Sequence, residues 1–401
     1  MRLGDVATYH RGLTYSKRDE ADDGSLRVLR ANNVSLERKV IDWEDVKQIN
    51  PSKAIRESVL LKSNDILMVA NSGSKDHVGK IAYVTQDYED VAFGGFMAAI
   101  RTKEGYPSRY IYHHLQSQAF RDYKDGLLAT ATINNLKGQL VEDFLIPLPP
   151  REVQDKVVEY LDTFAALCEN LDTEIAQREQ QFAAYREKLL STEYLMTHYF
   201  PNGAKYAKLG EIGEVRRGRG LTKRDLQDEG VPVIHYGQIY TRYGIATSET
   251  ISRVSSTITS KLTSVLPNSL IVASTSENLE DLGKCTVWRG KETIYTGLHT
   301  LVYSSQANTS FVANVLSTRR FYMYKSQNCY GAKVIELTAK AFADFCIPLP
   351  PRKVQDEIVT KLDAMQELID NLRLEREQRQ QQFDYYRERL LSFSKKNTAE
   401  V

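Results

Sequence analysis

Apolar residues recur at alternating steps of four and three positions in two long stretches of the chain, residues 146–191 and 347–392. This spacing aligns apolar side chains along one seam of a helix and is typical of a coiled coil. At 1.5 Å per residue, each predicted helix would be roughly 60 Å long. The seam of the first stretch is Val153, Val157, Leu161, Phe164, Cys168, Leu171, Ile175, Phe182, Tyr185 and Leu189, and that of the second is Val354, Ile358, Leu362, Met365, Ile369, Leu372, Phe383, Tyr386 and Leu390.

The two stretches are copies of one sequence. They lie 201 residues apart without a gap, and 27 of their 46 aligned residues are identical. Each opens with the proline-rich segment IPLPP, and each ends in YREKLLS or YRERLLS. Proline is tolerated in the first turn of a helix but not in its interior, so we expect each helix to begin directly after its prolines. A repeat of this length indicates a duplicated half rather than a solenoid.

Arginines interrupt both seams at matching positions, Arg178 and Arg379, with Arg376 one step earlier in the second copy. A polar residue in a seam lowers stability but fixes register and orientation. We therefore expect the two helices to pair with each other in antiparallel orientation. Packing of each helix on its own globular neighbour and formation of a dimer between two chains are the alternatives.

The remaining sequence forms two globular blocks that share an order of short apolar runs and turn residues. This alternation predicts a mixed α/β domain with a twisted sheet in each block. A Lys-Arg-Asp triplet follows the first segment of both blocks, and a Gly-Lys pair follows the third. The matching segments are Arg2–Gly12 and Lys208–Gly218, Leu26–Leu29 and Val231–Ile234, Asn64–Val69 and Asn268–Val272, and the helical Ser108–Tyr123 and Val312–Tyr324.

The predicted fold class is therefore α+β. It consists of two globular α/β domains in tandem, separated by two long helices that form an antiparallel coiled coil, with an internal pseudo-two-fold repeat. The predicted domains are residues 1–145, the first globular domain; 146–205, the first proline-led helix and a linker; 206–345, the second globular domain; and 346–401, the second proline-led helix and a tail.

Composition bounds the cellular context and the partners. The chain has 401 residues, 42% of them hydrophobic, which suffices for two cores besides the helices. The first residues lack the apolar run of a signal peptide, and no apolar stretch reaches 18 residues, so we expect a soluble, cytoplasmic protein without membrane contact. Four cysteines without a CxxC pair, Cys168, Cys285, Cys329 and Cys346, predict buried, reduced thiols.

Charge is divided unevenly between the blocks. Residues 1–145 hold 20 basic and 20 acidic side chains, whereas residues 206–345 hold 17 basic and 12 acidic ones. A nucleic-acid surface in the first block must therefore be a local patch, because that block is neutral.

Motifs for catalysis are missing. Gly73 and Gly79-Lys80 have the wrong spacing for a P-loop, and Ile81 stands where that motif needs Ser or Thr. There is no HExxH, and the adjacent His113 and His114 lie in a helical run that predicts one packed ring and one solvated ring. The sequence predicts a binding protein without a metal, a cofactor or an active site of its own.

Basic, amide and hydroxyl side chains gather at the predicted strand ends and polar loops of both blocks. Lys and Arg neutralise phosphates, and Arg, Asn and Gln read base edges, so the cluster favours DNA binding, although a solvated surface charge is the competing interpretation for each member. The candidates of the first block are Arg11, Lys17, Arg18, Arg27, Arg30, Asn32, Asn33, Ser72, Ser74, Lys75 and Lys80, and those of the second are Arg216, Arg217, Arg219, Lys223, Arg224, His235, Gln238, Tyr240, Arg242, Tyr243, Ser274, Thr275, Ser276 and Lys284.

This arrangement resembles the DNA-specificity subunit of type I restriction-modification systems. The resemblance covers nearly the whole chain and is carried by LIPLPPREVQDKVVEYLD and CIPLPPRKVQDEIVTKLD, by the YREKLLS and YRERLLS ends, and by the RLGDV and KLGEI starts. It implies that each block is a target-recognition domain for one half of a bipartite, asymmetric site on double-stranded DNA, and that the paired helices space the two domains. The diverged block loops do not allow base-reading positions to be carried over from the family.

The resemblance also implies partners. Two copies of a modification (methyltransferase) subunit would dock on the duplicated helices and supply S-adenosylmethionine and the adenine-methylating chemistry, and restriction subunits with ATP-driven translocase and nuclease activity could join them. The sequence leaves two other hypotheses. One is a scaffold that assembles proteins through the coiled coil without touching DNA, and the other is an autonomous enzyme, which the missing motifs disfavour.

Overall fold

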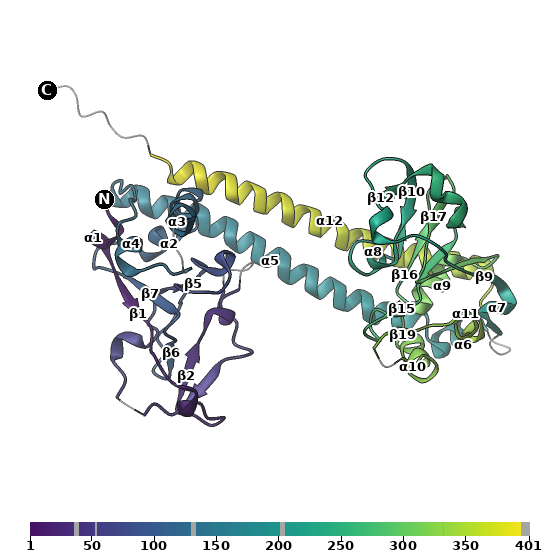
Figure 1. Ribbon diagram of the computed structural model, residues 1–401, viewed down its shortest axis with the longest axis horizontal. Helices are drawn as coiled ribbons and strands as arrows, with labels where there is room; N and C mark the ends of the chain where they lie inside the picture. Colours follow the sequence, from purple (N-terminus) through teal and green to yellow (C-terminus); the bar gives the residue numbers. More distant parts are fainter. Residues whose placement is uncertain (36–39, 53, 130–133, 201–204, 332, 394–401) are drawn as a thin grey trace, which may run out of the picture. The chain divides into compact units, whose positions relative to one another are not determined.

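The computed structural model describes residues 1–35, 40–52, 54–129, 134–200, 205–331 and 333–393 (Figure 1). The chain divides into two compact units, Met1–Asp172 with Leu374–Val401, and Thr173–Arg373. Each unit contains one globular domain and one part of each long helix, α5 (Arg151–Leu189) and α12 (Arg352–Leu391).

The domain of the first unit contains two sheets, with strand orders β1-β7-β4-β5 and β3-β2-β6. The first sheet is antiparallel, and in the second β2 runs antiparallel to β3 and parallel to β6. The strands are β1 (Ala7–Arg11), β2 (Leu26–Leu29), β3 (Lys47–Ile49), β4 (Ile66–Val69), β5 (Ile81–Tyr83), β6 (Val91–Phe93) and β7 (Met97–Thr102). The helices are α1 (Leu3–Val6), α2 (Ser108–His114), α3 (Gln118–Ala129) and α4 (Gly138–Glu142), with 3-10 turns η1 (Lys17–Asp19), η2 (Ala31–Asn33), η3 (Glu57–Val59) and η4 (Lys75–His77).

The domain of the second unit repeats this plan with additions. Its main sheets have the orders β11-β16-β14-β18-β9 and β12-β10-β17-β13, and β10 runs parallel to β17 as β2 runs parallel to β6. The strands are β8 (Tyr206–Lys208), β9 (Gly213–Arg217), β10 (Val231–Ile234), β11 (Ala246–Thr247), β12 (Ser252–Val254), β13 (Thr263–Val265), β14 (Leu270–Ala273), β15 (Thr275–Ser276), β16 (Cys285–Trp288), β17 (Ile294–Thr296), β18 (Thr300–Ser305), β19 (Ile335–Glu336) and β20 (Cys346–Pro348). The helices are α6 (Thr192–Tyr199), α7 (Leu209–Ile212), α8 (Tyr236–Thr241), α9 (Thr309–Leu316), α10 (Arg319–Asn328) and α11 (Ala339–Asp344), with 3-10 turns η5 (Lys223–Asp225) and η6 (Ser256–Lys261).

The anchors shared by the two blocks are turn residues. Asn64 and Asn268, which precede β4 and β14, have φ of 69° and 63°, a region that Asn tolerates better than most residues. Gly79 and Gly283, which precede β5 and β16, have φ of 81° and 77°. The repeated Gly-Lys pairs are therefore left-handed turns into a strand, which explains their recurrence without a bound nucleotide.

The long helices pair antiparallel, as predicted. In the first unit, Phe164 near the start of α5 stacks on Tyr386 near the end of α12, with ring centroids 5.4 Å apart. In the second unit, Phe182 near the end of α5 shares a core with Ile358 and Leu362 near the start of α12. The opposite order of the helix segments in the two units requires opposite directions.

The seam arginines act differently from the prediction. Arg178 and Arg379 hydrogen-bond to Glu and Gln side chains of their own helix. Arg376 instead crosses to α5 in the first unit, where Nε and Nη2 donate to Asp172 at 2.9 and 3.1 Å. In the second unit Arg373 forms an ion pair with Glu179 of α5. Register is therefore marked by Arg376 and Arg373, because only a side chain that reaches the partner helix can select it.

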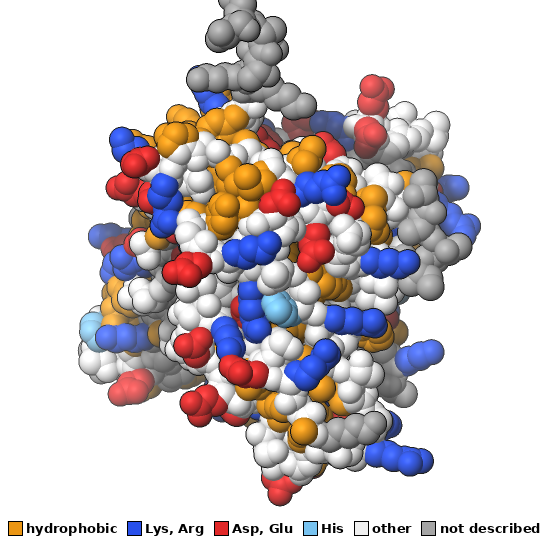
Figure 2. All heavy atoms as spheres, turned by 90° about the vertical axis from the view of Figure 1, so that its left-hand side faces the viewer, with side chains coloured by type: hydrophobic (Ala, Val, Ile, Leu, Met, Phe, Trp, Pro, Cys, Tyr) orange, Lys and Arg blue, Asp and Glu red, His pale blue; other side chains and the backbone are white. Residues whose placement is uncertain are grey.

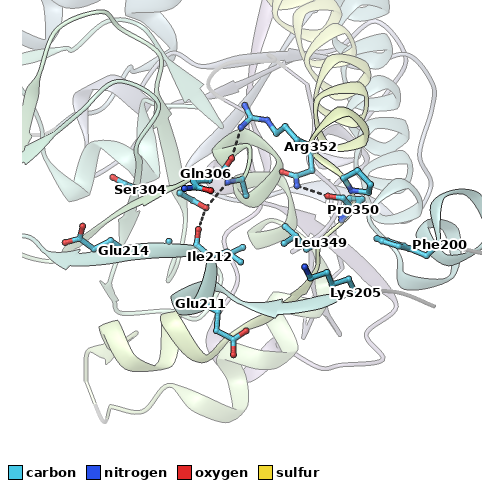
Figure 3. A pocket seen from close by; sticks show the side chains of 15 residues that line it. Phe200, Lys205, Glu211, Ile212, Glu214, Ser304, Gln306, Leu349, Pro350 and Arg352 are labelled. Carbon is cyan, nitrogen blue, oxygen red and sulfur yellow. Dashed lines mark hydrogen bonds between the residues drawn. The ribbon is translucent and has the colours of Figure 1, made fainter. Parts of the chain in front are cut away.

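Each long helix begins directly after its prolines, as predicted, and the glutamine of the repeated VQ pair secures the junction. Gln154 Nε2 donates to the Pro149 carbonyl at 2.8 Å, and Gln355 Nε2 donates to the Pro350 carbonyl at 2.8 Å. A side-chain amide thus supplies a donor to the carbonyl just before each long helix, which is partly buried at Pro149 and buried at Pro350. Arg352 Nη1 also donates to the Gln306 carbonyl at 2.8 Å and ties α12 to its domain (Figure 3).

Two smaller predictions need correction. His113 and His114 are both buried, with 1% and 3% of their surfaces exposed, because α2 is covered on both sides rather than on one. Cys168, Cys285 and Cys329 are buried free thiols, whereas Cys346 is half-buried. Among the described residues, no helix has the length and apolar character needed to cross a membrane.

Candidate nucleic-acid interface

Three segments of the first domain meet at one place, which we call the first edge: Arg11–Gly12 at the end of β1, Ala70–Ser74 after β4, and Gly94–Phe96 between β6 and β7. The Gly12 N–H donates to the Met97 carbonyl at 3.1 Å, next to this turn. The N–H groups of Ala70 and Asn71 donate to the Phe96 carbonyl at 2.9 and 3.0 Å. Sheet geometry therefore brings together loops that are far apart in sequence.

The second domain has a corresponding second edge: Arg217–Gly220 after β9, Ser274–Ser276 after β14, and Gly297–His299 between β17 and β18. The Gly218 N–H donates to the Thr300 carbonyl at 2.8 Å, and the Leu298 N–H donates to the Gly220 carbonyl at 3.0 Å. The Ser274 N–H donates to the His299 carbonyl at 2.8 Å. Two hydrogen bonds are common to both edges: the bond from Gly12 to Met97 corresponds to that from Gly218 to Thr300, and the bond from Ala70 to Phe96 corresponds to that from Ser274 to His299.

The glycine of each repeated Arg-Gly pair allows a close backbone approach within its edge. A Cβ atom at Gly12 would lie 2.1 Å from the Gly94 carbonyl oxygen, and one at Gly218 would lie 1.8 Å from the Gly297 carbonyl oxygen. Any other residue would force the two loops apart. The repeated glycine thus fixes its neighbouring arginine beside the turn between two strands.

A cleft opens beside each edge. The first has a volume of about 440 Å³ and is lined by Arg11, Tyr15, Ser52 and Arg56 among others. The second has a volume of about 570 Å³ and is lined by Arg216, Arg217, Arg219, Thr259, Ser260 and Tyr295 among others. Both combine guanidinium groups with hydroxyls, the side chains that bind phosphate and sugar oxygens.

The repeated Lys-Arg-Asp triplets are capped 3-10 turns. The Asp19 carboxylate accepts hydrogen bonds from the Ser16 N–H and Oγ at 2.8 and 2.9 Å, and Asp225 accepts the same pair from Thr222 at 2.6 and 2.8 Å. These hydrogen bonds lower the pKa of both carboxyls, so the caps stay charged. The aspartate is structural, and it presents the two basic side chains to solvent in the same way in both domains.

Some predicted residues are exposed basic side chains without a hydrogen-bond or ion-pair partner in the described part of the chain. Such groups can form phosphate contacts without first breaking a protein contact. They are Arg11, Lys17, Arg18 and Lys75 in the first domain, and Arg219, Lys223, Arg224 and Arg242 in the second.

Other predicted residues of the first domain have partners within the protein. Arg27 donates to both oxygens of Asp90 at 2.9 and 3.0 Å, while Arg30 and Asn32 both donate to Asp45, at 2.9 and 3.0 Å. These side chains must exchange a protein acceptor for a DNA acceptor, which reduces their net contribution to binding. Asn33 Nδ2 donates to the Asp42 and Asp45 carbonyls, and Lys80 Nζ donates to the Ala31 and Val34 carbonyls. Ser72 Oγ accepts a hydrogen bond from the Ser74 N–H.

The second domain holds its other predicted residues in the same manner. Arg216 donates to the Ser264 carbonyl at 2.9 Å, and Arg217 forms an ion pair with Glu336. Burial, with added repulsion from His299 and Lys223, lowers the pKa of His235. Gln238 Nε2 donates to Ser252 Oγ, Tyr240 Oη donates to the Thr275 carbonyl, and Lys284 Nζ pairs with Asp281. Tyr243 Oη accepts from the Ile251 N–H, and Ser276 Oγ accepts from the Asn278 N–H. Ser274 is buried.

Charge at the first domain is mixed. Figure 2 views the molecule from the side of this domain and shows Lys and Arg side chains interspersed with Asp and Glu. This agrees with the neutral count for residues 1–145, and it means that the free cations of the first edge act locally.

Several residues at the edges were missed by sequence reasoning. Arg56 lines the first cleft, and Tyr236 lies beside His299 with ring centroids 5.0 Å apart. Phe96 and Leu298 stand at the turns and are exposed. The available signal was an apolar residue directly after glycine or one position later, between two predicted strands.

A larger hollow of about 970 Å³ lies elsewhere in the second unit, at the junction of the proline-led segment with its domain (Figure 3). Its lining includes Lys205, Glu211, Glu214 and Arg352, a mixture of both charges that does not select a polyanion. Within the described residues, no group of three or more His, Cys, Asp or Glu side chains could hold a metal ion.

Comparison with known families places these edges in context. The type I restriction modification DNA specificity domain matches residues 1–179 and residues 201–382. The chain belongs to this family. Two family matches in tandem agree with the two structural copies, and each match includes most of one long helix along with one globular domain.

Relatives within the DNA specificity family match in part or along the whole chain. The StySPI specificity subunit of Salmonella potsdam is 31% identical over 189 residues, and the EcoKI specificity subunit of Escherichia coli K12 is 31% identical over 188 residues. Each alignment covers 46% of this chain and 40% of the relative, so the chain matches less than half the length of either. A Haemophilus influenzae protein named as a type I restriction enzyme specificity subunit is 25% identical over 402 residues, covering 90% of this chain and 97% of that one.

Solved structures share the fold. The type I restriction-modification S subunit of M. genitalium superposes with a TM-score of 0.55 at 15% identity, covering 98% of this chain and 96% of that chain. A chain from a structural study of complex assembly and conformational transition of the type I R-M system gives a TM-score of 0.61 at 16% identity, covering 98% and 95%. The predicted fold class is thus confirmed.

Proposed function

We propose that this chain is the non-catalytic subunit that reads a bipartite, asymmetric site on double-stranded DNA for a type I restriction-modification complex. The observation that carries the proposal is the duplicated edge. Two domains with one backbone plan each present free cations and a guanidinium-lined cleft, while their side chains differ. Two different edges fit two different half-sites, because side chains specify bases while the shared backbone positions them.

The free cations would supply affinity, and the loops would supply sequence preference. Eight predicted basic side chains lack a protein partner within the described residues, four in each domain. Each phosphate contact they form would release a counterion and make binding steeply dependent on salt. The mixed charge of the first domain implies that its half-site relies more on base contacts.

Methyltransferase subunits would dock on the helix pair. In the first unit Tyr160 and Tyr385 are 60% and 57% exposed on α5 and α12, and in the second unit Ala184, Tyr185 and Met365 line an apolar hollow of about 750 Å³. Exposed aromatic and apolar helix surfaces are typical of protein interfaces. S-adenosylmethionine would then be bound by those subunits, and ATP by a restriction subunit where one is present.

The first test is genome-wide mapping of methylated adenine in cells that make this chain with and without a candidate modification subunit. A two-part asymmetric motif that appears only when both are present is the expected result. If several modification subunits that co-purify with the chain yield no motif, the DNA-reading proposal is wrong.

Variants sharpen this test. Arg11→Ala and Arg219→Ala should each weaken binding of the assembled complex to the mapped motif and lower the slope of log affinity against log salt by about 0.9. Matched controls are Arg2→Ala and Lys208→Ala, exposed basic residues near the opposite ends of β1 and β9 that pair with Asp143 and Asp344. Equal losses in controls and test variants would contradict the assignment of the edges.

A scaffold without DNA contact is the second candidate, favoured by the exposed aromatic residues on the helices. It predicts that Tyr160→Ala and Tyr385→Ala abolish assembly, as the leading proposal also does. The two proposals differ in a gel shift of the assembled complex on the mapped motif, where a scaffold gives no salt-dependent band.

A further inference from the structure

Each edge carries an exposed apolar side chain among polar groups. Phe96 is 66% exposed at the turn between β6 and β7, and Leu298 is 48% exposed at the corresponding turn between β17 and β18. Single exposed apolar residues are common on protein surfaces, but here both copies carry one in the same turn, one position apart: the strand register aligns Phe96 with His299, and Leu298 with Gly95.

The turns hold these side chains outward. The Phe96 carbonyl accepts two hydrogen bonds, from the N–H groups of Ala70 and Asn71, and the Gly94 N–H donates to the Leu29 carbonyl at 2.8 Å. With its backbone fixed on both sides, the turn cannot fold back to bury Phe96. The exposure is therefore built into the edge and is not a feature of a loose loop.

The second turn also stores backbone strain. His299, next to Leu298, has φ of 68°, a conformation that non-glycine residues rarely adopt. Its ring lies against Tyr236, and the N–H of Ser274 donates to its carbonyl at 2.8 Å. Strain of this kind persists where surrounding contacts impose it, and it is concentrated at functional sites.

We propose that Phe96 and Leu298 contact the apolar surface of a DNA base pair, one in each half-site. This inference rests on the proposed function. B-DNA offers two apolar surfaces, the 5-methyl group of thymine and the face of a base exposed at a kinked step. Arg11 in the first edge and Arg219 in the second are free to bind a phosphate, and such a contact would bring the apolar side chain of the same edge toward the bases.

The energetic consequence is specific. Burying a phenylalanine or leucine side chain against DNA should raise the affinity by about 10- to 100-fold. Because an apolar side chain neutralises no phosphate, its removal should leave the salt slope unchanged. Substitution of Phe96 or Leu298 should therefore change the affinity alone, whereas substitution of Arg11 or Arg219 should change both the affinity and the salt slope.

The experiment uses the full chain assembled with its modification subunits and a duplex that carries the mapped methylation motif. Phe96→Ala and Leu298→Ala should each lose about 10- to 100-fold in affinity for the motif at an unchanged salt slope. Each variant should also lose discrimination at one half of the motif only, and the two variants should affect opposite halves. Each variant thus serves as the control for the other, and Phe96→Leu should retain most of the affinity.

Two further arms identify the apolar surface. If uracil in place of one thymine reproduces the loss in the wild-type complex and adds nothing in Phe96→Ala, the contact is the methyl group. If the fluorescence of 2-aminopurine placed at one base step rises on binding the wild-type complex but not on binding Phe96→Ala, the contact is an exposed base face. A loss of affinity with neither signature would overturn the proposal.

Other outcomes separate this inference from the function on which it rests. Unchanged affinity of Phe96→Ala and Leu298→Ala, with the wild-type complex binding its motif, overturns the inference alone. Loss of the modification subunit from purified Phe96→Ala complexes also overturns it, because Phe96 would then be a protein contact. Failure of the wild-type complex to bind the motif overturns the proposed function itself.

Discussion

Acid should destabilise the first domain more than the second, because of His114. Its side chain is 3% exposed, its ring edge packs on Tyr110 with centroids 4.7 Å apart, and its Nε2 has no hydrogen-bond partner among the residues that the structure describes. Burial, with a smaller contribution from His113, lowers the pKa of His114 to about 3. The corresponding residue of the second domain is Val315, which does not titrate.

The sign follows from proton linkage. The unfolded chain holds this histidine at a pKa of about 6.5, so below that pH the unfolded state binds a proton that the folded state rejects. The stability is fully present above about pH 6.5 and is lost progressively as the pH falls toward 3. With a folded pKa of about 3, the loss between pH 7.5 and pH 5.0 is about 2 kcal/mol. Burial also lowers the pKa of His113, against its hydrogen bond to Asp162, and acts in the same direction.

The assay exploits the two tryptophans of the chain, Trp43 in the first domain and Trp288 in the second. Urea denaturation of Trp288→Phe reports the first domain through Trp43, and Trp43→Phe reports the second. We expect His114 to cost the first domain about 2 kcal/mol between pH 7.5 and pH 5.0. The second domain should lose less, because the lowered pKa of its half-buried His235 acts in the same direction but no histidine there is as deeply buried as His114. His114→Val, which copies the second domain, should remove most of that dependence. An equal loss with and without His114→Val would refute the reasoning.

Three further predictions follow from particular contacts. Gly218→Ala should destabilise the second domain by about 1–3 kcal/mol, because its Cβ would overlap the Gly297 carbonyl. Gly73→Ala, whose Cβ would have nothing within 4 Å, should leave the stability of the first domain unchanged. Urea denaturation followed through the tryptophan of each domain measures both free energies of unfolding. A double-mutant cycle of Asp172→Ala and Arg376→Ala should give a coupling of about 0.5–1 kcal/mol, since both side chains are partly exposed, and zero coupling would mean that the pair does not hold the helices in solution. Burial raises the pKa of the Cys285 thiol to about 12, so it should resist thiol reagents at pH 8 until the domain unfolds, whereas rapid native labelling detected by mass spectrometry would contradict its burial.

Sequence alone determined the duplication and the two long helices. These features follow from local rules that repeat along the chain: a heptad seam, a proline break that starts a helix, and the same order of turn residues in both blocks. Local rules also identified positions such as Asn64 and Gly79 as turns, since their backbone conformations exclude most other residues.

Tertiary structure alone decided which residues meet. Arg11, Phe96 and Ala70 are far apart in sequence, and only the strand order β1-β7-β4 brings them to one edge. It also decided which candidates are free, because Arg30 and Lys80 are occupied by Asp45 and by backbone carbonyls that no sequence pattern links to them. Pairing across a sheet depends on register between distant segments, and a polar side chain reveals its partner only when that register is known.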